Sequence, residues 1–220
     1  MTTRRRPHRV VIVLLPLAAL VVCGGAVGSH LDPQKRLRPA DQARAKAMLL
    51  KKADLRGTFE SFPASSPPHN TCTGLDQSRL TLTGEARTPA WLGSSAFVAG
   101  AANVFASVGD ANASWKRLAS ATGGACTTMQ LGSSIGDPGG LQISLGRVPF
   151  PRVVPKTVVY RVVASSRGRK LVIDAIALQR SRAQVFVTIV GLGGSAPPRA
   201  EEVRLSHLLA KRMERVMRGT

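Results

Sequence analysis

The chain contains few acidic, aromatic and histidine residues. Its 220 residues include 12 Asp and Glu against 31 Lys and Arg, for a net charge of +19, with 2 Trp, 1 Tyr, 6 Phe and 4 His. So few aromatic residues argue against a nucleic-acid surface built on base stacking. The histidines are scattered, and no two stand at a metal-ligand spacing, so we predict no metal and no cofactor. The 44% hydrophobic content predicts one folded domain with its own core, because disordered basic tails are more polar.

The first 28 residues are predicted to direct the chain to a membrane. Residues 1–9 carry four arginines, and an uncharged stretch follows from Val10 through Val22 to Gly28. This order is typical of an export signal or of a single membrane span with its N-terminus in the cytoplasm. We favour a retained anchor that leaves the C-terminal domain outside the cell membrane. The alternative is secretion after cleavage near Gly28, because the apolar run is close to the short limit for a span.

Two cysteines, Cys72 and Cys126, follow the predicted membrane segment. An exported chain meets an oxidising compartment, where an even number of cysteines favours a disulfide over free thiols. We therefore predict a bond between Cys72 and Cys126.

The positive charge belongs mainly to the exported part of the chain. The first 28 residues contribute four arginines and no acids, which leaves 27 basic and 12 acidic residues and a net charge of +15. An exported protein rarely meets nucleic acid, and the sequence contains no helix-turn-helix, zinc-finger or RNA-binding motif. Anionic phospholipid headgroups or acidic wall polymers are the electrostatic partners that we expect. A solvated basic surface without a specific partner is the alternative.

Hydrophobic periodicity predicts an α+β domain over residues 40–220, after a linker at 29–39. The predicted helices are 40–55, 110–121 and 199–218, and the predicted strands are 80–86, 97–105, 140–146, 158–164, 170–178 and 185–192. The turns at 165–168 and 179–182 are too short for crossover helices, so the last three strands should form an antiparallel meander. The predicted fold is therefore an antiparallel sheet with a C-terminal three-stranded meander, flanked by amphipathic helices.

Several motifs between residues 40 and 218 resemble those of a known group of proteins. They are Lys-Lys-Ala-Asp-Leu-Arg at 51–56, Cys72, Leu-Thr-Leu-Thr-Gly-Glu-Ala at 80–86, Val-Phe-Ala-Ser at 104–107, Trp115, Cys126, and Val-Ile-Asp-Ala-Ile-Ala-Leu-Gln-Arg at 172–180. In this order they resemble actinobacterial envelope proteins, namely the extracellular sensor domain of PknH-type kinases and LpqN-type lipoproteins. The resemblance implies a curved antiparallel sheet flanked by helices, a binding or sensing role, and no catalytic residues.

One constellation has the residue types of a serine hydrolase. Ser134 lies in a G-x-S-x-G match, and Asp174 and His207 follow in the order found in α/β-hydrolases. The Asp-Pro-Gly-Gly sequence at 137–140 prevents the helix that must follow such a serine, so we interpret the match as a loop. A serine esterase remains a remote alternative. For Asp174 we expect the solvent face of the sheet or, alternatively, a groove in which it pairs with an arginine.

A second glycine motif also admits a simple explanation. Residues 191–196 match G-x-G-x-x-A, but Pro197 and Pro198 separate the glycines from the next helix, and the preceding strand belongs to a meander. We interpret these residues as turn glycines.

The sequence thus predicts a non-enzymatic, extracytoplasmic, sensor-like protein that binds a lipid, a wall polymer or an envelope protein between sheet and helices. The alternative is a basic structural or adaptor protein on an anionic membrane or wall surface.

Overall fold

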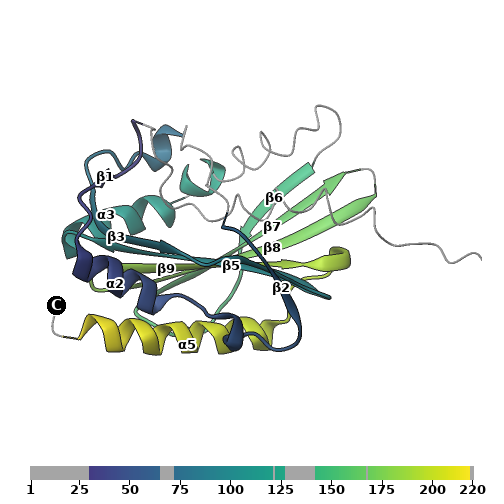
Figure 1. Ribbon diagram of the computed structural model, residues 1–220. Helices are drawn as coiled ribbons and strands as arrows, with labels where there is room; N and C mark the ends of the chain where they lie inside the picture. The colour runs from purple at the N-terminus through teal and green to yellow at the C-terminus, as the bar shows by residue number, and fades with distance from the viewer. Residues whose placement is uncertain (1–29, 65–71, 121, 127–141, 167, 219–220) are drawn as a thin grey trace, which may run out of the picture.

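The computed structural model describes residues 30–64, 72–120, 122–126, 142–166 and 168–218, which form one sheet with helices on both faces (Figure 1). Its strands are β1 Gln34–Lys35, β2 Phe59–Phe62, β3 Thr81–Arg87, β4 Ala90–Gly93, β5 Ala96–Phe105, β6 Gln142–Arg147, β7 Lys156–Ser166, β8 Arg169–Arg180 and β9 Ala183–Gly191. Its helices include α2 Pro39–Met48, α3 Val108–Leu118 and α5 Arg199–Met217, with short 3-10 turns at Lys52–Asp54, Thr73–Leu75 and Leu192–Gly194. Helices α2 and α5 cover one face of the sheet, and α3 lies on the other (Figure 1).

The order of strands across the sheet is β1-β3-β5-β9-β8-β7-β6, with β4 also paired to β5 and β2 paired to β4. The predicted α+β class is confirmed, and so is the antiparallel meander of β7, β8 and β9. The sheet is mixed rather than wholly antiparallel, because β1 pairs with β3 in parallel. The short strands β1, β2 and β4 were not predicted, since two to four residues cannot establish a period of two.

The segment predicted as a linker, 29–39, contributes to the fold. Leu31 is 6% exposed, and its carbonyl accepts a hydrogen bond from the Gln77 N–H at 2.8 Å. Strand β1 then follows the edge of β3, and Arg38 leads directly into α2. The folded domain therefore begins about ten residues earlier than the sequence indicated.

Two predicted helices have different ends in the structure. Helix α2 ends at Met48, and a 3-10 turn replaces the remainder of the predicted helix 40–55, with the Asp54 carboxylate accepting a hydrogen bond from the Lys51 N–H. Helix α3 begins at Val108, because the Ser107 hydroxyl, rather than Asp110, caps it by accepting a hydrogen bond from the Asp110 N–H at 3.0 Å.

The main core lies between the sheet and helices α2 and α5. Met48, Leu209 and Met213 are fully buried there against the valines of β9. Gly84 lets α2 approach the sheet, because a Cβ atom at this position would lie 2.2 Å from the carbonyl oxygen of Asp41. Any larger residue at position 84 would push the start of α2 away from β3.

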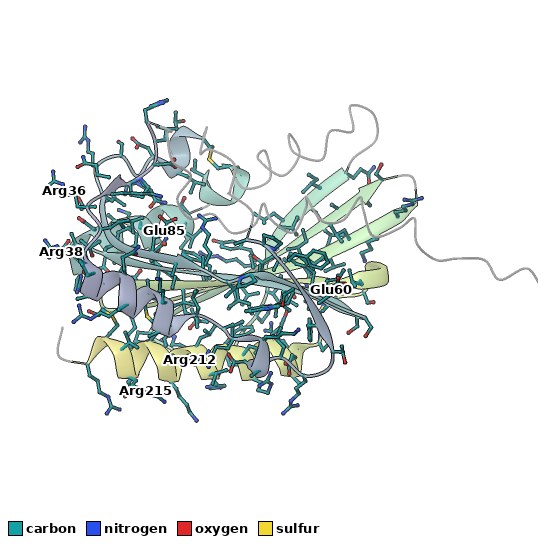
Figure 2. All side chains as sticks on the ribbon, viewed as in Figure 1. Arg36, Arg38, Glu60, Glu85, Arg212 and Arg215 are labelled. Carbon is teal, nitrogen blue, oxygen red and sulfur yellow. A yellow bond between two sulfur atoms is a disulfide. The ribbon has the colours of Figure 1, made fainter. Side chains whose placement is uncertain are left out.

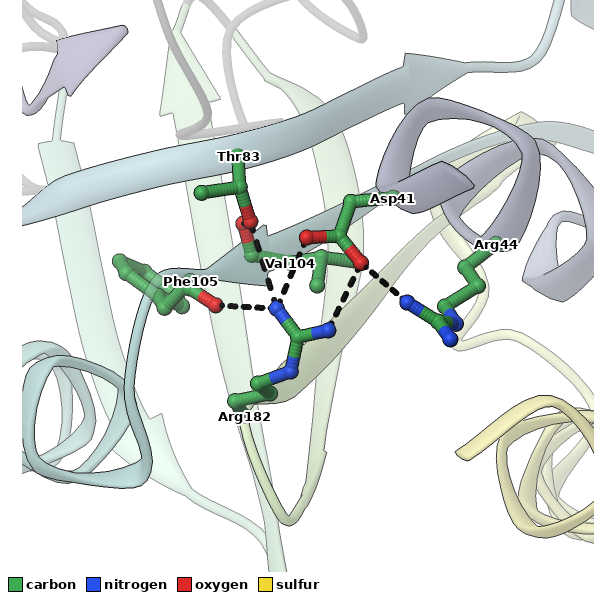
Figure 3. Close-up of polar contacts among 6 residues, drawn as sticks. All are labelled: Asp41, Arg44, Thr83, Val104, Phe105 and Arg182. Carbon is green, nitrogen blue, oxygen red and sulfur yellow. Dashed lines mark hydrogen bonds and ion pairs between the residues drawn. The ribbon is translucent and has the colours of Figure 1, made fainter. Parts of the chain in front are cut away.

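A buried ion pair fastens the start of α2 to the β8–β9 turn (Figure 3). Arg182 donates two hydrogen bonds to the Asp41 carboxylate, both at 2.8 Å, and a third to the carbonyl of Phe105 at 3.0 Å. Arg44 donates a further bond to Asp41 at 2.7 Å. Burial of Asp41 by itself would raise its pKa, but the hydrogen bonds from Arg182, Thr83 and Arg44 outweigh burial and lower the pKa well below its usual range.

No helix among the described residues is long and apolar enough to cross a bilayer. The predicted membrane segment, with Val10, Val22 and Gly28, lies outside these residues.

Candidate functional site

A small apolar hollow lies on the face of the sheet that carries α3. Its cavity volume is about 40 Å³, and its lining is mostly apolar. The floor comes from β7, β8 and β9, and the rim from Leu118 of α3, Gly124 and Leu145 of β6. The hollow is much smaller than ligand pockets of about 300–1,000 Å³. It has room for one water-sized or methyl-sized group.

Small side chains in the middle of the sheet create the hollow. Ala175 and Ala177 lie two residues apart on β8, so both point to the same face. Ala175 is paired with Tyr160 on β7 and with Thr188 on β9, while Ala177 is paired with Phe186. Two methyl groups thus stand between larger neighbours, which leaves a depression in the surface of the sheet.

Polar contacts hold one wall of the hollow in place. The Tyr160 hydroxyl donates a hydrogen bond to the carbonyl of Leu118 at 3.3 Å, at the end of α3. Arg147 of β6 donates to the same hydroxyl at 3.3 Å and to the carbonyl of Ala119. Its guanidinium carbon also lies 5.6 Å from the centre of the Tyr160 ring. These contacts connect α3 to the free edge of the sheet.

The predicted disulfide between Cys72 and Cys126 is confirmed, with the two Cα atoms 5.6 Å apart. Cys126 is the last described residue of the helical segment 122–126, which also carries Gly124 at the rim of the hollow. The bond thus fixes this segment to the 3-10 turn at Thr73–Leu75, where a Cβ atom on Gly74 would lie 3.0 Å from the Cys126 sulfur.

Asp174 does not lie on the solvent face of the sheet, which corrects our first expectation. It is 0% exposed and faces α5, and both of its carboxylate oxygens accept hydrogen bonds from Arg161 of β7, at 2.7 and 2.5 Å. The alternative, a pairing with an arginine, is therefore what the structure contains. A carboxylate inside an apolar strand is stable only with such a partner.

A second buried acid, Glu202 of α5, lies against Asp174. Glu202 is 0% exposed, and its Oε2 accepts a hydrogen bond from Arg199 at 3.1 Å. Burial, and then the hydrogen bond and charge of Asp174, raise the pKa of Glu202 to about 8, although Arg199 opposes the shift. Its Oε1 is buried and makes no hydrogen bond within the described residues when the carboxyl group carries no proton. A proton on the Glu202 carboxyl can be shared with Asp174 through a hydrogen bond, which is the contact that helps to raise the pKa of Glu202.

The shared proton predicts a pH-dependent stability that Glu202→Gln should remove. A raised pKa in the folded state stabilises the protein fully below about pH 4.5, and this contribution is lost as the pH rises through about 8. We expect the free energy of unfolding of the wild type to fall by roughly a few kcal/mol across this window. The Gln variant should lack this component, because its amide is neutral and still donates to Asp174. Urea unfolding followed by tryptophan fluorescence measures the difference.

Glu201→Gln is the matched control for this experiment. Glu201 lies on the same turn, but its side chain is 26% exposed and binds Arg204, which lowers its pKa. The control should retain the wild-type slope between pH 5 and 8, within the window set by Glu202. Equal slopes in wild type and Glu202→Gln would refute the shared proton.

The structure does not bring Asp174 and His207 together as a hydrolase would require. Asp174 is buried beneath α5 and bound to Arg161, whereas His207 is on the exposed side of the same helix. Ser134 lies outside the described residues. The esterase alternative therefore lacks the acid that would orient its histidine.

The glycines after β9 form a turn, as expected. Gly193 and Gly194 have φ angles of 72° and 81°, which favour glycine. Within the described ranges no group of three or more metal-ligating side chains is present. The residues of the hollow were not predicted as a site, although one signal was available: two alanines two residues apart within an otherwise bulky strand.

Comparison with known proteins finds weak similarity to solved structures. No protein-family model and no curated protein matches the chain. The extracellular domain of PknH from Mycobacterium tuberculosis is similar to 81% of this chain over 97% of its own length, with a TM-score of 0.48 and 13% identity. An uncharacterized protein from Mycobacterium smegmatis, an Rv0999 ortholog, is similar to 59% of this chain over 63% of its own, with a TM-score of 0.36 and 15% identity. The predicted resemblance to the PknH sensor domain is thus confirmed as a weak structural similarity.

Proposed function

We propose that this protein is a non-enzymatic binding domain, anchored by residues 10–28 and exposed outside the cytoplasmic membrane, that takes a slender apolar ligand into the hollow beneath α3. The observation that carries this proposal is the position of the hollow. It lies on the sheet face that α2 and α5 leave uncovered (Figure 1), and its floor includes Ala175 and Ala177. An acyl chain is the ligand class with the required width, because its cross-section is that of a methylene group.

Movement at the rim would enlarge the hollow without disturbing the main core. Leu118 and Leu145 are only half-buried, and they come from α3 and the edge strand β6. The core beneath α2 and α5 lies on the opposite face of the sheet. Burial of a chain of several methylenes would then contribute about 0.8 kcal/mol for each CH₂ group.

Filling the hollow should abolish binding of an apolar probe. We expect the full-length protein in detergent micelles to bind the fluorescent fatty acid cis-parinaric acid saturably. Ala175→Phe should raise the Kd at least tenfold, because the added ring occupies the floor between Tyr160 and Thr188. Ala43→Phe is the control, since it adds the same ring to the exposed side of α2.

Native mass spectrometry of protein purified from its own membranes provides the second test. A bound lipid should accompany the wild type and Ala43→Phe but not Ala175→Phe. Equal affinity of all three proteins for the probe would place its site elsewhere. Absence of both saturable binding and a co-purifying molecule would refute the proposed function.

A further inference from the structure

Two large hydrophobic side chains are exposed at the end of the molecule where the chain enters the fold. Leu37 is 46% exposed and Val108 is 48% exposed. Both adjoin the first half of β3. The N–H groups of Arg36 and Arg38, on either side of Leu37, donate hydrogen bonds to the carbonyls of Leu82 and Thr83. The N–H group of Ala106, shortly before Val108, donates one to the carbonyl of Thr81. Leu37 follows β1 and Val108 follows β5, so the two side chains lie on either side of the first half of β3.

Three exposed arginines accompany these hydrophobic residues. Arg36 and Arg38 flank Leu37, and Figure 2 shows both pointing away from the body of the domain on the same side. Arg79 precedes the start of β3 and is also exposed. None of the three has a carboxylate within 4.0 Å among the described residues. We refer to Arg36, Leu37, Arg38, Arg79 and Val108 as the arginine edge.

Two acidic side chains beside the start of β3 bind backbone N–H groups. The Asp110 carboxylate accepts a hydrogen bond from the Thr81 N–H at 3.2 Å, and the Asp76 carboxylate accepts one from the Ser78 N–H at 2.8 Å. The Asp76 carboxylate attracts Arg79 electrostatically, but no carboxylate of the described residues forms an ion pair with Arg36, Arg38 or Arg79, so their guanidinium groups can bind external anions. Arginine suits phosphate in particular, because its planar donors bind two phosphate oxygens at once.

The predicted membrane segment places this edge next to the bilayer. The segment ends at Gly28, and Leu31 is already fixed in the fold by burial and by its bond from Gln77. Three residues of extended chain span at most about 10 Å. With so short a connection, the side of the domain that carries Leu31 must face the membrane. Arg79 lies on this side, because Gln34 of the adjoining β1 donates hydrogen bonds to the carbonyls of Ser78 and Leu80.

We propose that the arginine edge docks onto anionic phospholipid headgroups in the outer leaflet of the membrane that anchors the chain. Leu37 and Val108 enter the interfacial layer, and Arg36, Arg38 and Arg79 bind lipid phosphates while their aliphatic stems lie along the apolar region. Each basic residue near an anionic bilayer strengthens association by about fivefold. This inference rests on the predicted anchor and is independent of the hollow, which lies on a different part of the sheet.

Photo-crosslinking of the full-length protein tests the proposal. Leu37 or Val108 is replaced by p-benzoylphenylalanine, and the protein is placed in bilayer discs of equimolar phosphatidylcholine and phosphatidylglycerol. Lys116 on α3 and Lys211 on α5, both exposed, are replaced in the same way as controls. We expect at least tenfold more lipid adduct from positions 37 and 108 than from positions 116 and 211. Comparable adduct from all four positions would overturn the proposal.

Charge variants separate specific docking from general attraction. Arg36→Glu/Arg38→Glu/Arg79→Glu should reduce the adduct at position 108 at least tenfold. Lys116→Glu/Arg169→Glu/Lys170→Glu changes the net charge equally at other exposed sites and should leave the adduct unchanged. An equal loss in both variants would overturn docking through this edge. So would the same yield in discs of phosphatidylcholine alone, or crosslinks formed only to an added anionic wall polymer.

Discussion

Asp41→Ala is expected to lower the free energy of unfolding by about 3–5 kcal/mol, the usual effect of removing one partner of a buried ion pair. Asp41 is 2% exposed, and the side chain of Arg182 is 15% exposed. Without the carboxylate, Arg182 keeps only its bonds to uncharged oxygens of Phe105 and Thr83. Helix α2 also loses its connection to the β8–β9 turn (Figure 3). Denaturant unfolding measures the loss.

Two further variants identify the cause of the loss. Glu214→Ala removes an acid whose pairs with Arg180 and Arg218 are substantially exposed, so it should change stability by less than about 1 kcal/mol. Asp41→Leu/Arg182→Met removes both charges and should recover most of the stability that Asp41→Ala loses. A loss below about 1 kcal/mol in Asp41→Ala would contradict the assignment.

The pH dependence of this pair has the opposite sign to that of Glu202. Because the pKa of Asp41 is lowered from its ordinary value of 3.8, its contribution to stability is present above that value and is lost as the pH falls through the folded pKa. The difference between wild type and Asp41→Ala should therefore persist from neutral pH to about 4 and shrink only in stronger acid. Glu202, by contrast, loses its contribution as the pH rises.

The longer elements of the fold could be predicted because each one carries its own pattern. Strand β8 extends from Arg169 to Arg180 and α5 from Arg199 to Met217, and both agree closely with the predicted ranges. The 3-10 turn that replaces the end of the predicted helix 40–55 could not be foreseen. It depends on the contact between Asp54 and Arg212, which are 158 residues apart.

The environment of Asp174 could not be predicted for a similar reason. Strand β8 is apolar on both of its faces, so the alternation of its side chains does not indicate which face is covered. Only the packing of α5 against β8 decides that Asp174 is buried beside Glu202. The hollow likewise depends on pairing, because Ala175 forms a depression only between Tyr160 and Thr188.

Removal of the disulfide, by Cys72→Ser/Cys126→Ser, has the other largest expected effect. The bond joins residues 54 positions apart, and in the chain-entropy model a loop of this length stabilises the folded state by about 4 kcal/mol. The loop contains β3, β4, β5 and α3, so the unfolded chain gains freedom over much of the sheet. Since residual structure in the unfolded chain changes this value, we expect the free energy of unfolding to fall by about 2–5 kcal/mol, as measured by urea unfolding.

The same substitution should also loosen the rim of the hollow. Cys126 is 1% exposed and holds the segment 122–126, whose Gly124 lies so close to Leu145 that a Cβ atom there would be 2.8 Å from its methyl group. Hydrogen exchange at 122–126 should accelerate more than exchange in β8, where Ile173 is fully buried and paired on both sides.

Cys23→Ser is the control and should change neither the free energy of unfolding nor the exchange rates, because Cys23 takes no part in the bond. If the double variant unfolds at the same urea concentration as the wild type, the covalent link contributes nothing to stability. Uniform acceleration across the sheet would show that it stabilises the domain as a whole rather than the rim.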